Sequence, residues 1–151
     1  MAGQVPDTAG EGSEPVLPEE SILRRISYTY MEGPRKDKIS PNVFKPRLVD
    51  TDGLSFFREN FHTPKELACA PGPESRHVAR VAVESINALG LSVRPDPDPP
   101  KWPGHCIVPE LHAGNRDDPW AKDLRVKLAG QFSDLVGPIL CADADGVGDE
   151  E

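Results

Sequence analysis

Residues 77–91 read HVARVAVESINALGL, and the spacing of their apolar side chains changes partway along. In the first half apolar and polar residues alternate, which places Ala79, Val81 and Val83 on one side of an extended chain. From Val83 to Leu89 the spacing is helical, and Gly90 follows where helices commonly end. We therefore expect a strand to about residue 82, a short helix to residue 89, and a further strand over 91–93. A single helix over 75–89 is the alternative.

Three other segments have the composition of strands. Residues 22–31 are rich in β-branched and aromatic side chains, and residues 54–57 follow a turn over 50–53. Residues 105–108 follow five prolines within 94–103. We expect the proline-rich segment to be an extended loop with few hydrogen bonds, because proline has no N–H to donate.

Two helices are marked by their first residues. Thr63 at the N-cap, Pro64 at the first helical position and Glu66 two residues later form a capping box, which predicts a helix from 64 to about 70. Asp118 and Pro119 begin the longest expected helix, which ends at Gly137. Its apolar stripe is Trp120, Leu124, Leu128 and Phe132. The fold class that follows is α+β: a small single domain with several short strands, short helices and one longer amphipathic C-terminal helix.

The charge of the chain is concentrated at its ends. The 151 residues include 17 Lys and Arg against 25 Asp and Glu, a formal net charge of −8. Residues 1–20 and 142–151 each contribute five acidic residues and no basic ones, which leaves residues 21–141 at +2. Few large apolar side chains occur in either end. We expect a single domain over 21–141 between two disordered acidic tails.

Several kinds of chemistry are disfavoured by the motifs. The sequence has no spacing typical of a zinc site, no glycine-rich phosphate loop and no nucleophile elbow, so no metal or cofactor is expected. Cys106 follows His105 on an expected strand, where neighbouring side chains point to opposite faces and cannot share a proton. The three cysteines are odd in number and no apolar run could span a membrane, which favours a cytoplasmic protein with reduced thiols.

The segment 24–47 is the strongest candidate for a binding site. It carries seven basic residues against two acidic ones, a charge of +5 that suits a phosphate or an acidic protein surface. His105, at the start of an expected strand, can donate or accept a proton near neutral pH. The candidate ligand- or partner-binding residues are Arg24, Arg25, Ser40, Lys45, Arg47 and His105.

Short motifs in a fixed order suggest a family. They are Arg24-Arg25-Ile26, Ser40 to Phe44 followed by Lys45-Pro46, Asp52-Gly53-Leu54-Ser55, Thr63-Pro64-Lys65-Glu66, Leu89-Gly90-Leu91, Asp96-Pro97, Pro103-Gly104-His105 and Leu128-Ala129. In this order, over residues 22–136, the chain resembles a family of small uncharacterised bacterial proteins. Cys106 departs from the alanine that is common there, and the acidic tails are longer. The resemblance implies a compact bacterial cytosolic protein and supplies no catalytic residues.

Two functions follow as hypotheses, and enzymatic activity is left open. The first is a non-catalytic accessory protein of a bacterial cytosolic system, which binds a partner protein through residues 24–47 and the loop 94–104. The alternative is a small enzyme or binding protein for a phosphorylated or nucleotide-like ligand. In that case Arg24, Arg25, Ser40 and Lys45 bind the anion and His105 transfers a proton. Nucleic acid is disfavoured as a partner because the overall charge is negative.

Overall fold

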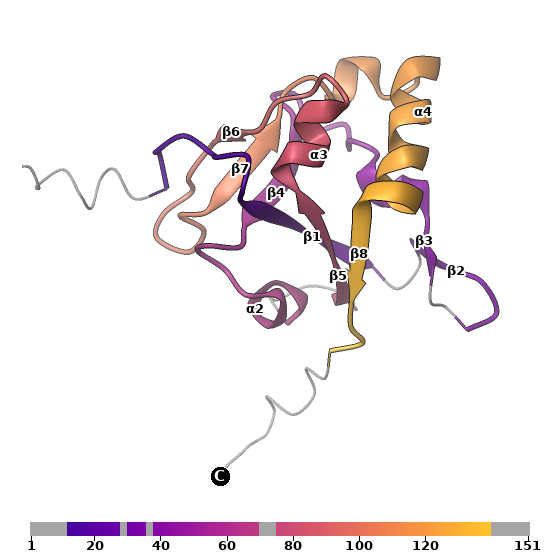
Figure 1. Cartoon of the computed structure of the whole chain (residues 1–151), viewed down its shortest axis with the longest axis horizontal. Coiled ribbons are helices and arrows are strands. Elements are labelled where there is room, and N and C mark those ends of the chain that lie inside the picture. The colour runs from indigo at the N-terminus through magenta and orange to yellow at the C-terminus, as the bar shows by residue number, and fades with distance from the viewer. Residues whose placement is uncertain (1–11, 28–29, 36–37, 70–74, 140–151) are drawn as a thin grey trace, which may run out of the picture.

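A computed structural model describes residues 12–27, 30–35, 38–69 and 75–139. Within them the fold is α+β: helices lie on both faces of an antiparallel six-stranded sheet, with a separate two-stranded ribbon beside it (Figure 1). The strands are β1 (Ser21–Ser27), β2 (Met31–Glu32), β3 (Lys38–Ile39), β4 (Leu54–Arg58), β5 (Ser75–Ala82), β6 (Arg94–Pro95), β7 (His105–Val108) and β8 (Ser133–Val136). The helices are α2 (Pro64–Ala68), α3 (Val83–Ala88) and α4 (Pro119–Lys127), with the 3-10 helices η2 (Pro41–Phe44) and η3 (Ala113–Asn115) and the π-helix η4 (Leu128–Phe132).

The strand-to-helix change over residues 77–89 is confirmed, and the single helix is wrong. β5 runs to Ala82 and α3 begins at Val83. The helix ends before Gly90, which has a φ of +85° that a residue with a Cβ rarely adopts. β5 lies between β1 and β8 in the sheet order β6-β7-β4-β1-β5-β8. The pairing of β5 with β1 is longer than its pairing with β8.

Other local predictions hold with small changes of length. β4 and β7 form at the expected positions, and α2 begins with the capping box of Thr63 and Glu66. The first strand is shorter than expected, because β1 ends at Ser27 and the chain re-enters a strand only at Met31.

The proline-rich loop makes more hydrogen bonds than expected. Residues 91–93 are not a strand; β6 follows them, pairing Arg94 with Ile107 and Pro95 with Cys106. Proline is tolerated there because β6 is an edge strand. The non-proline residues between the prolines supply the donors: the Asp96 N–H donates to the His105 carbonyl over 2.9 Å, and Asp98 and Trp102 exchange two backbone bonds.

The expected C-terminal helix is interrupted before Gly137. α4 ends at Lys127, η4 continues to Phe132, and residues 133–136 form β8 along the edge of β5. Residues 133–136 gain backbone hydrogen bonds from the open edge of β5. The helical spacing of their side chains does not reveal this partner. The stripe is also only partly buried: Leu128 is 1% exposed, whereas Trp120 is 47% exposed.

Two hydrophobic clusters lie on opposite faces of the sheet. The larger one joins the sheet to η2, α3, α4 and η4, and the smaller one lies under α2 (Figure 1). Adjacent residues of one strand divide between them, since Ile22 and Phe56 belong to the larger cluster and Leu23 and Phe57 to the smaller one. Because of this alternation, side chains lie on both faces of the sheet where β1 and β4 stop pairing.

Residues 12–20, the described part of the expected N-terminal tail, contact the domain at Arg58. The carboxylate of Glu20 pairs with Arg58 through two bonds of 3.0 and 2.8 Å, and both side chains are buried. The remaining Arg58 N–H groups donate to the carbonyls of Gly12, Glu14 and Pro15. The N-terminal part of the described chain is thus wrapped around one arginine. Residues 1–11 and 142–151, the rest of the expected tails, lie outside the described residues.

Acid should weaken this pairing. Burial raises the pKa of Glu20, but hydrogen bonds from Arg58 and from the Leu17 N–H, with attraction to Arg58, lower it by more. The net pKa lies below the ordinary value of 4.5, so the carboxylate stabilises the fold above pH 4.5 and this stability is lost as the pH falls below it.

We expect Glu20→Gln to be less stable than the native protein at pH 7 and to lose less stability between pH 7 and about pH 3.5. Urea unfolding at both pH values measures this. Glu19→Gln, at an exposed neighbouring position, is the matched control and should follow the native protein. An acid-induced loss in Glu20→Gln as large as the native one would contradict the assignment.

The cysteines differ from the expectation of reduced thiols. Cys69 is disulfide-bonded, while Cys106 on β7 is free and buried, and burial raises its pKa well above the ordinary value. Cys106 is therefore a small buried apolar side chain. Among the described residues no helix is both long and apolar enough to cross a bilayer.

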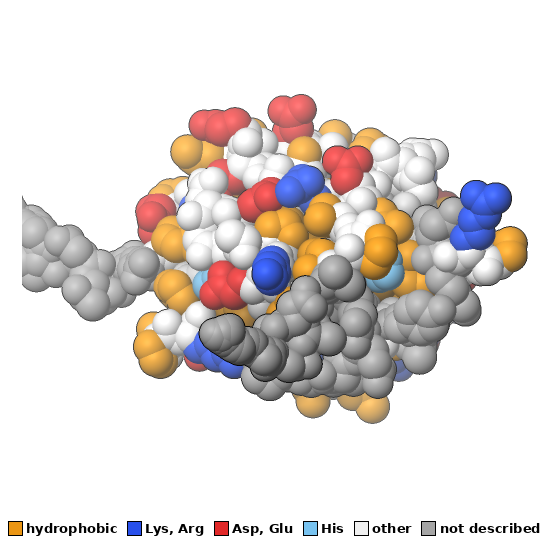
Figure 2. All heavy atoms as spheres, turned by 90° about the horizontal axis from the view of Figure 1, so that it is seen from below, with side chains coloured by type: hydrophobic (Ala, Val, Ile, Leu, Met, Phe, Trp, Pro, Cys, Tyr) orange, Lys and Arg blue, Asp and Glu red, His pale blue; other side chains and the backbone are white. Residues whose placement is uncertain are grey.

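The surface that carries α2 has mixed charge. Figure 2 shows this side, where the visible Lys and Arg side chains are scattered among acidic and apolar ones. Positive charge is not spread over this face as a single field.

Candidate functional site

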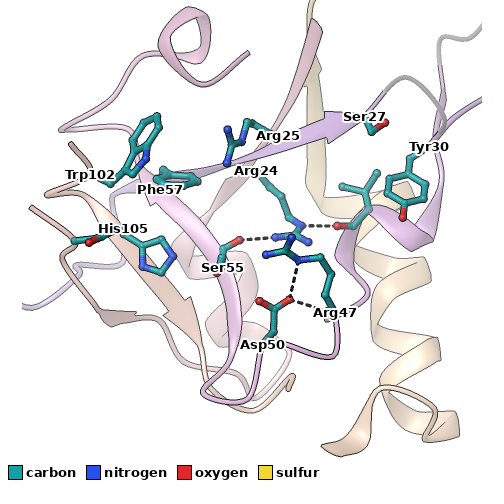
Figure 3. A pocket seen from close by; sticks show the side chains of 12 residues that line it. Arg24, Arg25, Ser27, Tyr30, Arg47, Asp50, Ser55, Phe57, Trp102 and His105 are labelled. Atoms are coloured by element: carbon teal, nitrogen blue, oxygen red, sulfur yellow. Dashed lines mark hydrogen bonds and ion pairs between the residues drawn. The ribbon is translucent and has the colours of Figure 1, made fainter. Parts of the chain in front are cut away.

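A cavity of about 350 Å³ opens where β1 and β4 stop pairing (Figure 3). Their register consists of Ile22 with Arg58 and Leu23 with Phe57, although both strands continue. Beyond this point Arg24 occupies the gap: its Nη1 donates to the Ser55 carbonyl over 2.7 Å, and its Nε donates to the Val43 carbonyl. The Arg24 side chain thus takes the place of backbone hydrogen bonds between β1 and β4, and it lines the cavity.

Three arginines line this cavity, Arg24 and Arg25 of β1 and Arg47 in the loop after η2. Figure 3 shows the guanidinium groups of Arg24 and Arg47 side by side, whereas that of Arg25 points toward Phe57 and Trp102. Burial, together with the charges of Arg47 and Arg25, lowers the pKa of Arg24 to about 10, although Asp50 and Tyr30 oppose the shift. Burial and the charge of Arg47 also lower the pKa of Arg25. The cations therefore destabilise one another, and a bound anion would relieve that repulsion.

Arg25 is held by aromatic rings rather than by an acceptor. Its Cζ lies 5.7 Å from the centroid of Phe57 and 5.8 Å from that of Trp102. The two rings are themselves in contact, with centroids 4.8 Å apart. Across the described part of the chain, Arg25 has no hydrogen bond or ion pair. Its N–H donors are therefore available to a ligand in a fixed position.

Two carboxylates line the same cavity. Asp50 is 8% exposed, accepts the backbone N–H of Arg47 over 2.7 Å, and lies 3.8 Å from the Arg47 Nε. Asp98 lies at the other end, beside Trp102. The three arginines outnumber these carboxylates, and the pairing with Asp50 is longer than a hydrogen bond. The cavity therefore keeps an excess of positive charge.

His105 lines the cavity with one ring nitrogen engaged. Its Nδ1 lies 2.9 Å from the Asp96 carbonyl and 3.2 Å from the Asp96 carboxylate. A carbonyl oxygen only accepts, so Nδ1 carries the proton and Nε2 of the neutral ring is an acceptor. The ring stands edge-on to Phe57, with centroids 5.3 Å apart, because Phe57 and His105 are paired across β4 and β7.

Gly104 fixes the backbone just before His105. Its N–H donates to Nε2 of the buried His62 over 3.0 Å, and its carbonyl accepts from the Arg58 N–H. A Cβ at this position would lie 2.6 Å from both the His62 ring and the Phe61 side chain. Only glycine fits here without a shift of its neighbours. Packing at Gly104 therefore sets the backbone position of the adjacent His105.

The structure separates two of the proposed site residues from the others. Ser40 is 4% exposed and caps η2, where its hydroxyl accepts the Asn42 N–H over 3.1 Å. Lys45 forms an ion pair of 3.5 Å with Asp117 and lines a neighbouring cavity. The structure does not bring Ser40 and Lys45 to the cavity that Arg24 and Arg25 line.

Several lining residues were not proposed from the sequence. In the sequence Phe57 reads as an apolar strand residue and Asp50 as part of a turn, so neither stands out as a binding residue. The proximity of Trp102 to His105 in the sequence is the one feature that could have suggested that both residues line the same cavity.

No group of three His, Cys, Asp or Glu side chains with the arrangement of a metal site occurs in the ranges that the structure describes. Comparison with family models, with curated proteins and with solved structures gave no match for this chain. The resemblance to small bacterial proteins stays a prediction, and the function must be argued from the site alone.

Proposed function

We propose that this protein binds a small phosphorylated, nucleotide-like ligand in the cavity between β1 and β4. The observation that carries the proposal is that Arg24, Arg25 and Arg47 all line one cavity. Planar guanidinium groups match the oxygens of a phosphate, and their mutual repulsion favours an anion between them. Arg25 is the main expected contact because its donors are not engaged.

The shape and the walls of the cavity suit a phosphate attached to a planar ring. Its volume of about 350 Å³ is near the lower end of the range for small-molecule sites, about 300–1,000 Å³. Trp102, which is partly exposed, offers apolar surface beside Arg25 on which a nucleobase could stack. A nucleoside monophosphate combines these two features.

His105, which lines the cavity beside Phe57, also has a place in this proposal. Its Nε2, as the acceptor of the neutral ring, can receive a hydrogen bond from a ligand hydroxyl or amine. If the ligand is a substrate, the same nitrogen is the group that would take the proton. The Asp96 contact at Nδ1 would stabilise the resulting positive charge.

Isothermal titration calorimetry of the full chain tests the proposal. The ligands are the four common nucleoside monophosphates and ribose 5-phosphate, with adenosine as the phosphate-free control. We expect at least one nucleoside monophosphate to bind about tenfold or more tightly than its nucleoside, because a charge-assisted hydrogen bond contributes about 1.5–3 kcal/mol. Absence of binding by every phosphorylated ligand, or equal binding of adenosine and its monophosphate, would contradict the proposal.

The second candidate function is the accessory role, with a partner protein bound through the 24–47 region. Leu48 and Val49, just after Arg47, are 74% and 71% exposed, and an exposed apolar pair beside a cation suits an acidic, apolar partner surface. Native mass spectrometry of protein isolated gently from its host tests it. A second chain at fixed stoichiometry that is lost in Leu48→Asp would support this role, and the bare chain mass would count against it.

A further inference from the structure

A second cavity, of about 260 Å³, adjoins the first one. Tyr30 and Arg47 line both cavities, so they form the partition between them. The Arg47 side chain is 74% exposed and the Tyr30 residue 43% exposed. Both side chains are therefore largely open to solvent.

The second cavity is also cationic. Lys45, Arg47 and Arg116 line it, and none of the described lining residues is a carboxylate. Lys45 pairs with Asp117 at 3.5 Å, but this carboxylate is 72% exposed, so solvent weakens the pairing. Arg47 lies 3.8 Å from the Asp50 carboxylate. The Arg116 Nε donates to the Pro46 carbonyl over 2.9 Å, which orients the guanidinium. Its terminal N–H groups make no hydrogen bond among the described residues.

We propose that the second cavity holds a second phosphate of the same ligand, with Arg47 between the two phosphates. The ligand class is then a nucleoside that carries phosphates at two positions of its sugar. This inference rests on the proposed function, because it assumes that the first cavity binds a nucleotide. It explains why Lys45, which does not reach the first cavity, belongs to the same basic segment as Arg47.

The test compares adenosine 3′,5′-bisphosphate with adenosine 5′-monophosphate by calorimetry on the full chain. We expect the bisphosphate to bind about tenfold or more tightly, which is the contribution of one further charge-assisted contact. Lys45→Met and Arg116→Met should each reduce the affinity for the bisphosphate and leave that for the monophosphate within about twofold. Lys38→Met, an exposed lysine of the same basic segment outside both cavities, is the matched control and should change neither affinity.

The possible outcomes separate the inference from the function on which it rests. If the monophosphate binds and the bisphosphate binds no better, the second subsite is wrong and the proposed function stands. If Lys45→Met weakens both ligands equally, the lysine acts on the whole site and the inference also fails. If neither ligand binds, both proposals fail. Thermal unfolding of each variant, with a midpoint close to the native one, shows that Arg116→Met still folds.

Discussion

Arg58→Met is expected to lower the free energy of unfolding by about 3–5 kcal/mol, the cost of removing one partner from a buried ion pair. The guanidinium is 2% exposed, and its five N–H groups donate to Glu20 and to three backbone carbonyls. Methionine fills much of the volume but leaves the Glu20 carboxylate buried without a counter-charge. The segment that wraps around Arg58 loses its common donor at the same time.

Urea unfolding followed by circular dichroism measures this loss. Arg80→Met is the matched control, because Arg80 pairs with Glu59 at comparable distances of 2.8 and 2.6 Å but both side chains are partly exposed. The control should cost about 1 kcal/mol or less. The double variant Glu20→Leu with Arg58→Met should recover part of the loss, since no charge is then left unpaired. A cost for Arg58→Met no greater than that of Arg80→Met would show that burial does not govern this pair.

Arg25→Met should weaken the binding of a nucleoside monophosphate by about 10- to 100-fold, because it removes a cavity guanidinium that has no hydrogen-bond acceptor or ion-pair partner among the described residues. The change in the free energy of unfolding should stay within about 1 kcal/mol, since Arg25 contributes contacts to Phe57 and Trp102 but no hydrogen bond. A large change in affinity with a small change in stability distinguishes a binding residue from a structural one.

Arg35→Met provides the matched control, with the same loss of charge at an exposed position of the same basic segment. It should change the affinity by less than about threefold, because solvent and salt screen a charge outside the cavity. Arg25→Lys keeps the charge without the planar fork and should restore binding only in part. Equal weakening by Arg25→Met and Arg35→Met would indicate a general electrostatic effect instead of a contact in the cavity.

Elements governed by neighbouring residues could be predicted from the sequence. The capping box of Thr63 and Glu66 fixes the start of α2, and the change of apolar spacing at Val83 fixes the boundary between β5 and α3. Both signals act within one or two turns of the chain. The alternation of β7 likewise follows from its own side chains.

Elements governed by distant partners were mispredicted. The end of the C-terminal helix became β8 because β5 offers an open edge, and β6 formed among prolines because β7 offers another. Glu20, which was expected in the acidic tail, is buried because it pairs with the buried Arg58, 38 residues away. In each case a backbone or charged group gains a hydrogen-bond partner that no local pattern reveals.

The same division holds for the candidate site. The sequence by itself determined that positive charge gathers in residues 24–47 and that His105 begins a strand, because composition and local spacing are properties of neighbouring residues. Only the tertiary structure decided that Arg24, Arg25 and Arg47 share one cavity, that Ser40 caps η2, and that Lys45 lines the next cavity. The physical reason is that β1 and β4 stop pairing after Leu23, while β4 and β7 continue to pair through Phe57 and His105. The register between strands that are distant in the sequence therefore sets which charges meet.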